Sequence, residues 1–78
     1  MSNIIDRLTI VIREVFDDDS LQVTKSMTSS DVDGWDSLGN VRLFLSIEQE
    51  FAVRFSAGEI TAIKNVGDLV NAIEAKLK

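Results

Sequence analysis

Residues 34–39 read Gly34-Trp35-Asp36-Ser37-Leu38-Gly39, and they mark the point where a long polar segment gives way to an apolar helical pattern. Asp36 suits the N-cap of a helix, because its carboxylate can accept a hydrogen bond from one of the backbone N–H groups that open a helix. Ser37 is then the first helical residue. Its hydroxyl lies close to unpaired N–H donors at the positive end of the helix dipole, which favours a phosphate ester once one is attached.

The sequence contains no residue that would make Ser37 a catalytic nucleophile. It has no histidine and no cysteine, so a Ser–His or Cys–His pair is excluded. Acidic residues are plentiful, but no base, nucleophile pair or ligand cluster accompanies them, and we predict that the protein is not an enzyme. Ser37 is better interpreted as a serine that another protein modifies. The alternative is that Asp36 and Ser37 are only a helix start, since this pair is common capping chemistry.

Composition predicts one small globular domain covering residues 1–78. Hydrophobic residues make up 45% of the chain and charged residues 27%, and a chain of this length buries only about 60% of its unfolded surface. No apolar run approaches the roughly 20 residues of a membrane span, and the first residues lack the basic start of a secretory signal, so we expect a cytoplasmic monomer. The net charge of −5 argues against nucleic acid or an anionic membrane as a partner and favours partners with basic surfaces. The lack of a long apolar run predicts no membrane insertion.

One segment has the partial spacing of a calcium loop. Asp31, Asp33 and Gly34 match the third, fifth and sixth positions of an EF-hand. The first ligand would then be Ser29, and the twelfth would be Asn40 where a bidentate glutamate is needed. Because two ligands fail, we predict no metal site.

The first predicted helix follows apolar residues at helical spacing from Ile4 to Phe16, with Asn3 as its N-cap. It should end near Phe16, because the acidic run at 17–19 opposes the dipole at a helix C-terminus. The loop at 17–36 has no helical or strand period. We expect its irregularly spaced apolar residues to anchor it to the core; they are Leu21, Val23, Met27, Val32 and Trp35.

Two later helices are marked by capping motifs. Ser56 with Glu59 forms a capping box before a brief helix at 57–61, and Asn65 with Asp68 repeats this motif before a helix that runs from Val66 to the end. The second helix spans 37–51. The prediction is therefore all-α: a small four-helix bundle with a long first loop and a short third helix.

The second helix carries two apolar stripes, whereas a helix in a small monomer needs one. The wider stripe should face the core and consists of Leu43, Phe44, Ile47 and Phe51. The other lies beside Ser37 and consists of Leu38, Val41 and Leu45. We interpret this second stripe as a docking surface for enzymes; the alternative is that the loop covers it. Gly39, in the first turn, leaves room for the close approach of another group.

Together these features resemble the acyl carrier protein family. The resemblance covers nearly the whole chain, and it rests on residues 34–39 at the head of the second helix, on Glu48-Gln49-Glu50-Phe51 at its end, and on Asn65-Val66-Gly67-Asp68-Leu69. It implies that a phosphopantetheinyl transferase attaches 4′-phosphopantetheine from coenzyme A to Ser37, which Asp36 and Leu38 flank. The arm's thiol, which a chain without cysteine cannot supply, would carry acyl groups as thioesters to acyl-loading and acyl-processing enzymes.

The resemblance also implies a pathway and an acyl cleft. Fatty-acid, polyketide or other specialised lipid biosynthesis would use such a carrier. Gly39 and Arg42 stand at positions where fatty-acid carriers often have acidic residues. A specialised pathway therefore fits this chain at least as well as housekeeping fatty-acid synthesis does. A folded-back acyl chain would contact Phe44, Ile47, Ile60, Ile63 and Leu69. Two alternatives stay open: an aminoacyl (peptidyl) carrier, and a helical protein-interaction module in which Ser37 is not modified.

Overall fold

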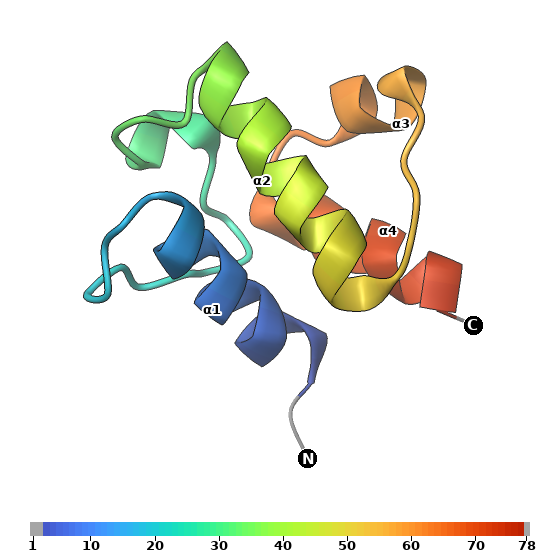
Figure 1. Cartoon of the computed structure of the whole chain (residues 1–78), viewed down its shortest axis with the longest axis horizontal. Coiled ribbons are helices and arrows are strands. Elements are labelled where there is room, and N and C mark those ends of the chain that lie inside the picture. Colours follow the sequence, from blue (N-terminus) through green and yellow to red (C-terminus); the bar gives the residue numbers. More distant parts are fainter. Residues whose placement is uncertain (1–2, 78) are drawn as a thin grey trace.

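A computed structural model gives the conformation of residues 3–77, which are helical with no strand among them (Figure 1). Its elements are α1 (Ile4–Val15), the 3-10 helix η1 (Ser29–Asp31), α2 (Ser37–Phe51), α3 (Ala57–Ala62) and α4 (Val66–Leu77). The all-α class and the four predicted helices are confirmed, with the ends within about one residue of prediction. Helix η1 lies in the loop for which the sequence predicted no helix.

Two of the predicted caps form as expected. The side-chain oxygen of Asn3 accepts a hydrogen bond from the Asp6 N–H at 3.0 Å, which opens α1. At α3, the Ser56 hydroxyl accepts from the Glu59 N–H at 3.2 Å, and the Glu59 carboxylate accepts from the Ser56 N–H at 2.9 Å. Both halves of the capping box are therefore present, and they let a helix of one and a half turns begin at a fixed residue.

The cap of α4 differs from the prediction in one bond. The Asn65 side chain accepts from the Asp68 N–H at 2.8 Å, as expected. The Asp68 carboxylate, however, accepts from the N–H of Lys64 at 3.1 Å and not from that of Asn65. The carboxylate therefore fixes the residue before the N-cap, which holds the α3–α4 connection against the start of α4.

The long loop supplies further caps to α4. The carbonyl of Met27 accepts from the Val66 N–H at 2.9 Å, and the carbonyl of Lys25 accepts from the Gly67 N–H at 2.8 Å. These bonds satisfy N–H groups that have no partner inside the helix. Because Met27 is also buried, the loop is tied to α4 by both backbone and side chain.

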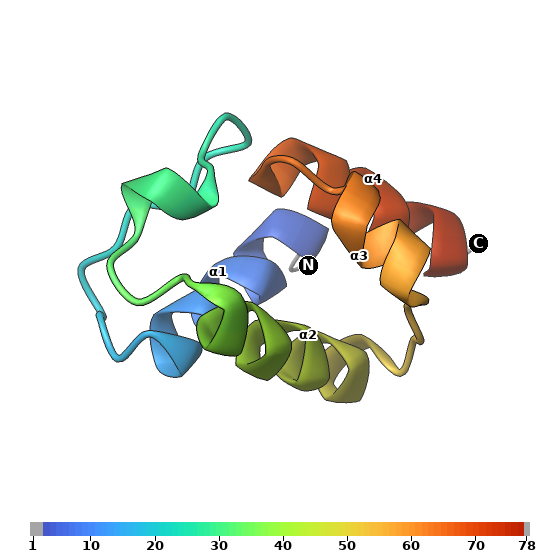
Figure 2. The same ribbon diagram turned by 90° about the horizontal axis from the view of Figure 1, so that it is seen from above.

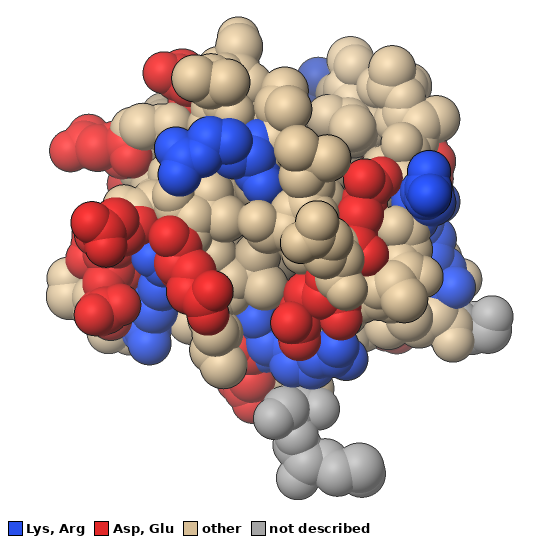
Figure 3. Space-filling model, viewed as in Figure 1, with Lys and Arg blue, Asp and Glu red and all other residues tan. Residues whose placement is uncertain are grey.

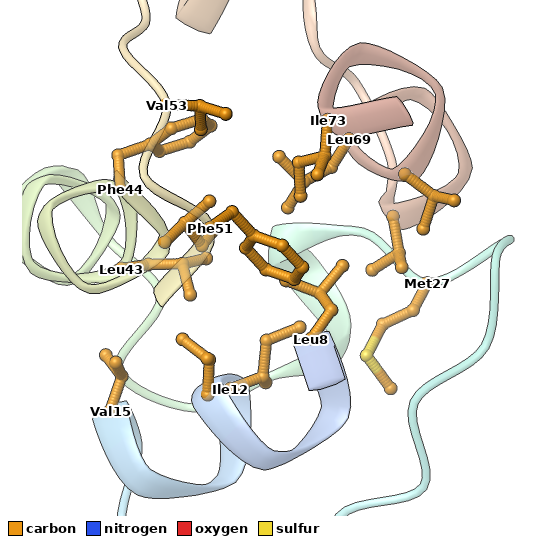
Figure 4. Packing of buried hydrophobic residues seen from close by; sticks show 14 of the residues in the cluster. Leu8, Ile12, Val15, Met27, Leu43, Phe44, Phe51, Val53, Leu69 and Ile73 are labelled. Carbon is orange, nitrogen blue, oxygen red and sulfur yellow. The ribbon is translucent and has the colours of Figure 1, made fainter. Parts of the chain in front are cut away.

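The core lies between α1, α2 and α4 (Figure 4). Each of the three helices buries one apolar face, and α3 has no fully buried residue. The completely buried core side chains are Leu8, Ile12, Leu43, Ile47, Val66, Leu69 and Ile73. The predicted loop anchors are also confirmed: Met27 and Val32 are buried, and Leu21, Val23 and Trp35 pack against the core.

Helices α1 and α2 exchange arginine contacts at opposite ends. Arg7 near the start of α1 donates to the carbonyl of Glu50 at the end of α2 at 2.8 Å, and its guanidinium lies 4.4 Å from the centre of the Phe51 ring. Arg42 near the start of α2 donates to the carbonyl of Val15 at the end of α1 at 2.9 Å. The two helices are therefore antiparallel, and each places a cation at the negative C-terminal end of the other.

The segment before α2 and the end of α4 lie at opposite ends of the molecule (Figure 2). Between these ends, the loop reaches the start of α4 through the Met27 and Lys25 carbonyls. Within residues 3–77, no helix has the length and hydropathy needed to cross a membrane.

Candidate functional site

Ser37 is the first residue of α2, and its side chain is exposed. The Asp36 carboxylate accepts a hydrogen bond from the Gly39 N–H at 2.9 Å, so the predicted N-cap is confirmed. The Asp36 carbonyl accepts from the Asn40 N–H at 2.8 Å, which is the first bond of the helical ladder. Among the hydrogen bonds of residues 3–77, none involves the Ser37 hydroxyl. The structure thus fixes the backbone around Ser37 and leaves its oxygen available.

Gly39 is required by a contact within the chain. A Cβ atom built on Gly39 would lie 2.1 Å from the carbonyl oxygen of Gly34 and 3.1 Å from the ring of Phe16. Gly34 itself has a φ of +90°, a conformation that favours glycine. The group that closely approaches Gly39 is therefore the loop that leads into α2, and Gly39 is buried beneath it.

Trp35 connects this loop to both neighbouring helices. Its ring stacks on Phe16, the residue that ends α1, with 5.6 Å between ring centres and 30° between ring planes. Its indole N–H donates to the side-chain oxygen of Asn40 in the first turn of α2 at 2.9 Å. The ring is half-buried, which agrees with its predicted role in fixing the approach to α2.

The second apolar stripe of α2 faces solvent. Leu38 is 69% exposed, and Val41 and Leu45 are each 55% exposed. The alternative in which the loop covers them is wrong, because the loop packs on the other side of the first turn, against Gly39 and Phe16. Figure 3 shows largely uncharged surface over the region where α2 begins in Figure 1.

A pocket of about 200 Å³ lies beside this stripe, between α2 and α3. Its lining residues are Asn40, Val41, Phe44, Leu45, Glu48, Phe55 and Ile60. Two of the lining rings, those of Phe44 and Phe55, meet edge to face with their centres 5.3 Å apart. The pocket begins one turn from Ser37.

Of the five residues predicted to contact a folded-back acyl chain, two line this pocket, and the contact itself stays a prediction. Phe44 and Ile60 line the pocket. Ile47 and Leu69 are completely buried in the core, and Ile63 packs against it from a half-buried position. The ring of Phe55, which the sequence analysis did not consider, also lines the pocket and contacts the ring of Phe44.

One ion pair fixes the outer wall of the pocket. The Lys76 ammonium lies 2.7 Å from the Glu59 carboxylate, which joins α4 to α3, and 5.1 Å from the centre of the Phe55 ring. The hydrogen bond from Lys76, together with bonds from Ser56, lowers the pKa of the exposed Glu59 carboxyl. Glu59 therefore stays ionised at neutral pH and holds Lys76 over Phe55.

Curated proteins with similar sequences share one name. The chain is 34% identical to the acyl carrier protein of Phenylobacterium zucineum over 99% of this chain and 98% of that protein. It is 36% identical to the acyl carrier protein of Caulobacter vibrioides over 97% of each. The chain belongs to the acyl carrier protein family. No family model matches the sequence.

A solved structure of an acyl carrier protein has the same fold as this chain. The solution NMR structure of holo acyl carrier protein from Geobacter metallireducens is 43% identical in sequence and superposes with a TM-score of 0.88, covering 92% of this chain and 83% of that one. The fold predicted from the resemblance is thus confirmed.

The residues around Ser37 fit the prosthetic group of acyl carrier proteins, 4′-phosphopantetheine. The hydroxyl that would form the phosphodiester is exposed at the start of a 15-residue helix, where a negative phosphate is favoured. Leu38 and Val41 offer apolar surface to the arm beside it, and the chain has no thiol of its own.

Sequence reasoning missed the partners that hold Ser37 in place. The sequence analysis placed Phe16 at the end of a helix. It considered Asn40 only as the twelfth residue of a calcium loop, where a glutamate would be needed. Trp35 and Asn40 are five residues apart, which matches no helical or strand spacing. They meet because Asp36, which lies between them, has the extended backbone of an N-cap, with a φ of −99° and a ψ of −164°.

Replacing Gly39 with alanine should destabilise the protein, although alanine is the better helix former by about 1 kcal/mol. The added Cβ must displace the Gly34 carbonyl, and such overpacking costs about 1–3 kcal/mol. Gly58→Ala is the matched control, because its Cβ would have 4.0 Å to the nearest atom, and it should stabilise by up to about 1 kcal/mol. Urea unfolding followed by circular dichroism measures both. Changes of the same sign would contradict this account of Gly39.

Proposed function

We propose that Ser37 carries 4′-phosphopantetheine and that the protein, acting as one domain over residues 1–78, presents acyl groups on this arm to biosynthetic enzymes. The main support is the combination of an exposed, rigidly presented serine with membership of the acyl carrier protein family. The chain is then a substrate of its partner enzymes and supplies no catalytic group. That it works as a cytoplasmic monomer stays a prediction.

Attachment requires a phosphopantetheinyl transferase as the first partner. The Ser37 oxygen forms the new bond to the phosphorus of the pantetheine phosphate, the diphosphate bond of coenzyme A breaks, and adenosine 3′,5′-bisphosphate leaves. We assign the acceptance of the Ser37 proton to a base of the transferase. Asp36 contributes indirectly, by capping the helix on which Ser37 is held.

We propose that Leu38, Val41 and Leu45 form the docking surface for the transferase and for acyl-loading and acyl-processing enzymes. They are exposed, lie on one face of α2 and begin next to Ser37. Arg42 is exposed and charged, and the bond from its guanidinium to the Val15 carbonyl holds this charge against the end of α1. The chain's net charge of −5 still favours partners with a basic rim.

The departures from the acidic pattern of fatty-acid carriers have structural causes in this chain. An acid at position 39 would clash with Gly34, and Arg42 caps α1. Neither residue therefore identifies the pathway by itself, and fatty-acid and polyketide or other specialised lipid biosynthesis both stay within the proposal. An aminoacyl cargo is the remaining alternative within the carrier class.

The pocket between α2 and α3 is the proposed site for the first carbons of an acyl chain. Its walls are mainly apolar, and it opens beside the docking stripe. The edge-to-face pair of Phe44 and Phe55 forms part of these walls.

Ser37 should be the only site of loading. Incubation with coenzyme A, magnesium and a broad-specificity transferase should add one phosphopantetheine to the wild type and to Ser46→Ala, and none to Ser37→Ala. Intact-mass spectrometry measures the addition. If the folded wild type gains no mass with two different transferases, the interaction-module alternative is favoured and Asp36-Ser37 is only a cap.

Leu45→Asp should weaken recognition by the transferase without weakening the fold. A charge in the centre of an apolar contact loses buried area and must be desolvated, so we expect kcat/KM to fall by roughly tenfold or more. Ile10→Asp is the matched control, since Ile10 is 57% exposed on α1, away from Ser37, and its kcat/KM should be unchanged. Equal losses in both variants would contradict a docking role for the α2 stripe.

Acylation should change the NMR shifts of the pocket residues and spare those of the deep core. The amide and methyl or ring signals of Phe44, Phe55 and Ile60 should differ between the arm-only and the acylated forms. Those of Ile12 should not, because it is completely buried on α1. If no pocket signal moves, the cargo stays outside the protein.

A further inference from the structure

We propose that Trp35 and Asn40 form a positioning pair that holds Ser37 in the geometry needed for phosphoryl transfer. The inference rests on the proposed attachment of phosphopantetheine to Ser37. It assigns a role to two residues that neither dock an enzyme nor react.

The hydrogen bond between Trp35 and Asn40 joins the residues on either side of Ser37. The Trp35 indole N–H bonds to the Asn40 side chain at 2.9 Å, which links a residue before the helix to one in its first turn. Inside this link, the Asp36 carboxylate bonds to the Gly39 N–H, also at 2.9 Å. Ser37 therefore lies within two nested cross-links that span the start of the helix, and neither uses its side chain.

Such cross-links matter because the first turn of a helix is its weakest part. The N–H groups of the first residues have no intrahelical partners, so a helix frays from this end. An N-cap alone secures only one of these groups. The Trp35–Asn40 bond adds a second constraint from outside the helix.

The outer cross-link is anchored in the body of the protein. The Trp35 ring stacks on Phe16, and the neighbouring Gly34 carbonyl packs against Gly39 with no room for a side chain. Phe16 follows α1, whose end is joined to α2 through the Arg42 bond to Val15. The position of Ser37 is thus fixed by contacts with both α1 and α2, and not by the loop alone.

This arrangement predicts a specific kinetic effect. Reactions that need aligned atoms slow sharply when one reactant is displaced or mobile. The pair does not include Leu38, Val41 or Leu45, so docking should survive its loss. Breaking the bond should therefore lower kcat of the transferase for this protein while leaving KM nearly unchanged.

The test is a double-mutant cycle with the complete protein as substrate. Asn40→Ala removes the acceptor, and Trp35→Phe removes the donor while keeping an aromatic ring against Phe16. Each single change should lower kcat by about three- to tenfold, the equivalent of one hydrogen bond. The double variant should lose no more than either single variant, because both break the same bond.

Two further variants separate positioning from general stability. Asn40→Asp keeps an oxygen acceptor for the indole N–H and should restore kcat to near the wild-type value. Ser56→Ala removes the α3 cap, destabilises by a similar amount and should leave kcat unchanged. Amide hydrogen exchange gives an independent readout: it should accelerate at Gly39 and Asn40 in Asn40→Ala and not in Ser56→Ala.

The outcomes are distinguishable from failure of the proposed function. If the wild type is not loaded at all, the attachment proposal itself fails. If the wild type is loaded and Asn40→Ala and Trp35→Phe match its kcat, or lose activity additively, or change only KM, the positioning role is overturned while the attachment site stands.

Discussion

The antiparallel register of α1 and α2 is the constraint on which the rest of the structure depends. Burial supplies most of the energy, since each apolar side chain in this core contributes roughly 1.5–3 kcal/mol. That term is not directional, and it would tolerate some sliding of one helix along the other. The contacts of Arg7 and Arg42 with the C-terminal carbonyls of the opposite helix are smaller, at about 1 kcal/mol each, but they form at only one register. This register places Phe16 beside Gly39, and the start of α2 follows from that contact.

Gly39 and Arg42 are residues whose identity is explained by internal contacts, although the sequence suggested that they modify partner docking. Both stand on the helix that presents Ser37, so the sequence alone suggested an altered docking surface. In the structure, a side chain at position 39 is excluded by the Gly34 carbonyl, and Arg42 satisfies a carbonyl of α1. The surface that α2 offers to partners is the stripe of Leu38, Val41 and Leu45, whose side chains are each more than half exposed.

Sequence reasoning succeeded where the determining interactions are local. The helix bounds follow from apolar period and from caps three residues apart, such as Ser56 with Glu59, and these were predicted within about one residue. It failed where the partners meet through the loop or across helices. Trp35 and Asn40 meet because the extended N-cap residue Asp36 lies between them. The Asp68 carboxylate accepts from the N–H of Lys64, in the preceding connection, and not from that of Asn65. The pocket could not be predicted for the same reason: no periodic pattern indicated that Phe55 would pack against Phe44.

The contact between Phe44 and Phe55 bears on how any cargo would be held. Both rings line the pocket of about 200 Å³, so they must separate for a chain to enter between them. The edge-to-face contact of Phe44 and Phe55 is worth about 0.5–1.5 kcal/mol, whereas each methylene buried gains about 0.8 kcal/mol. Two or three additional buried methylenes therefore offset the separation of the rings. Because Lys76 lies over Phe55 and is paired with Glu59, movement of that ring would also disturb the ion pair that joins α3 to α4.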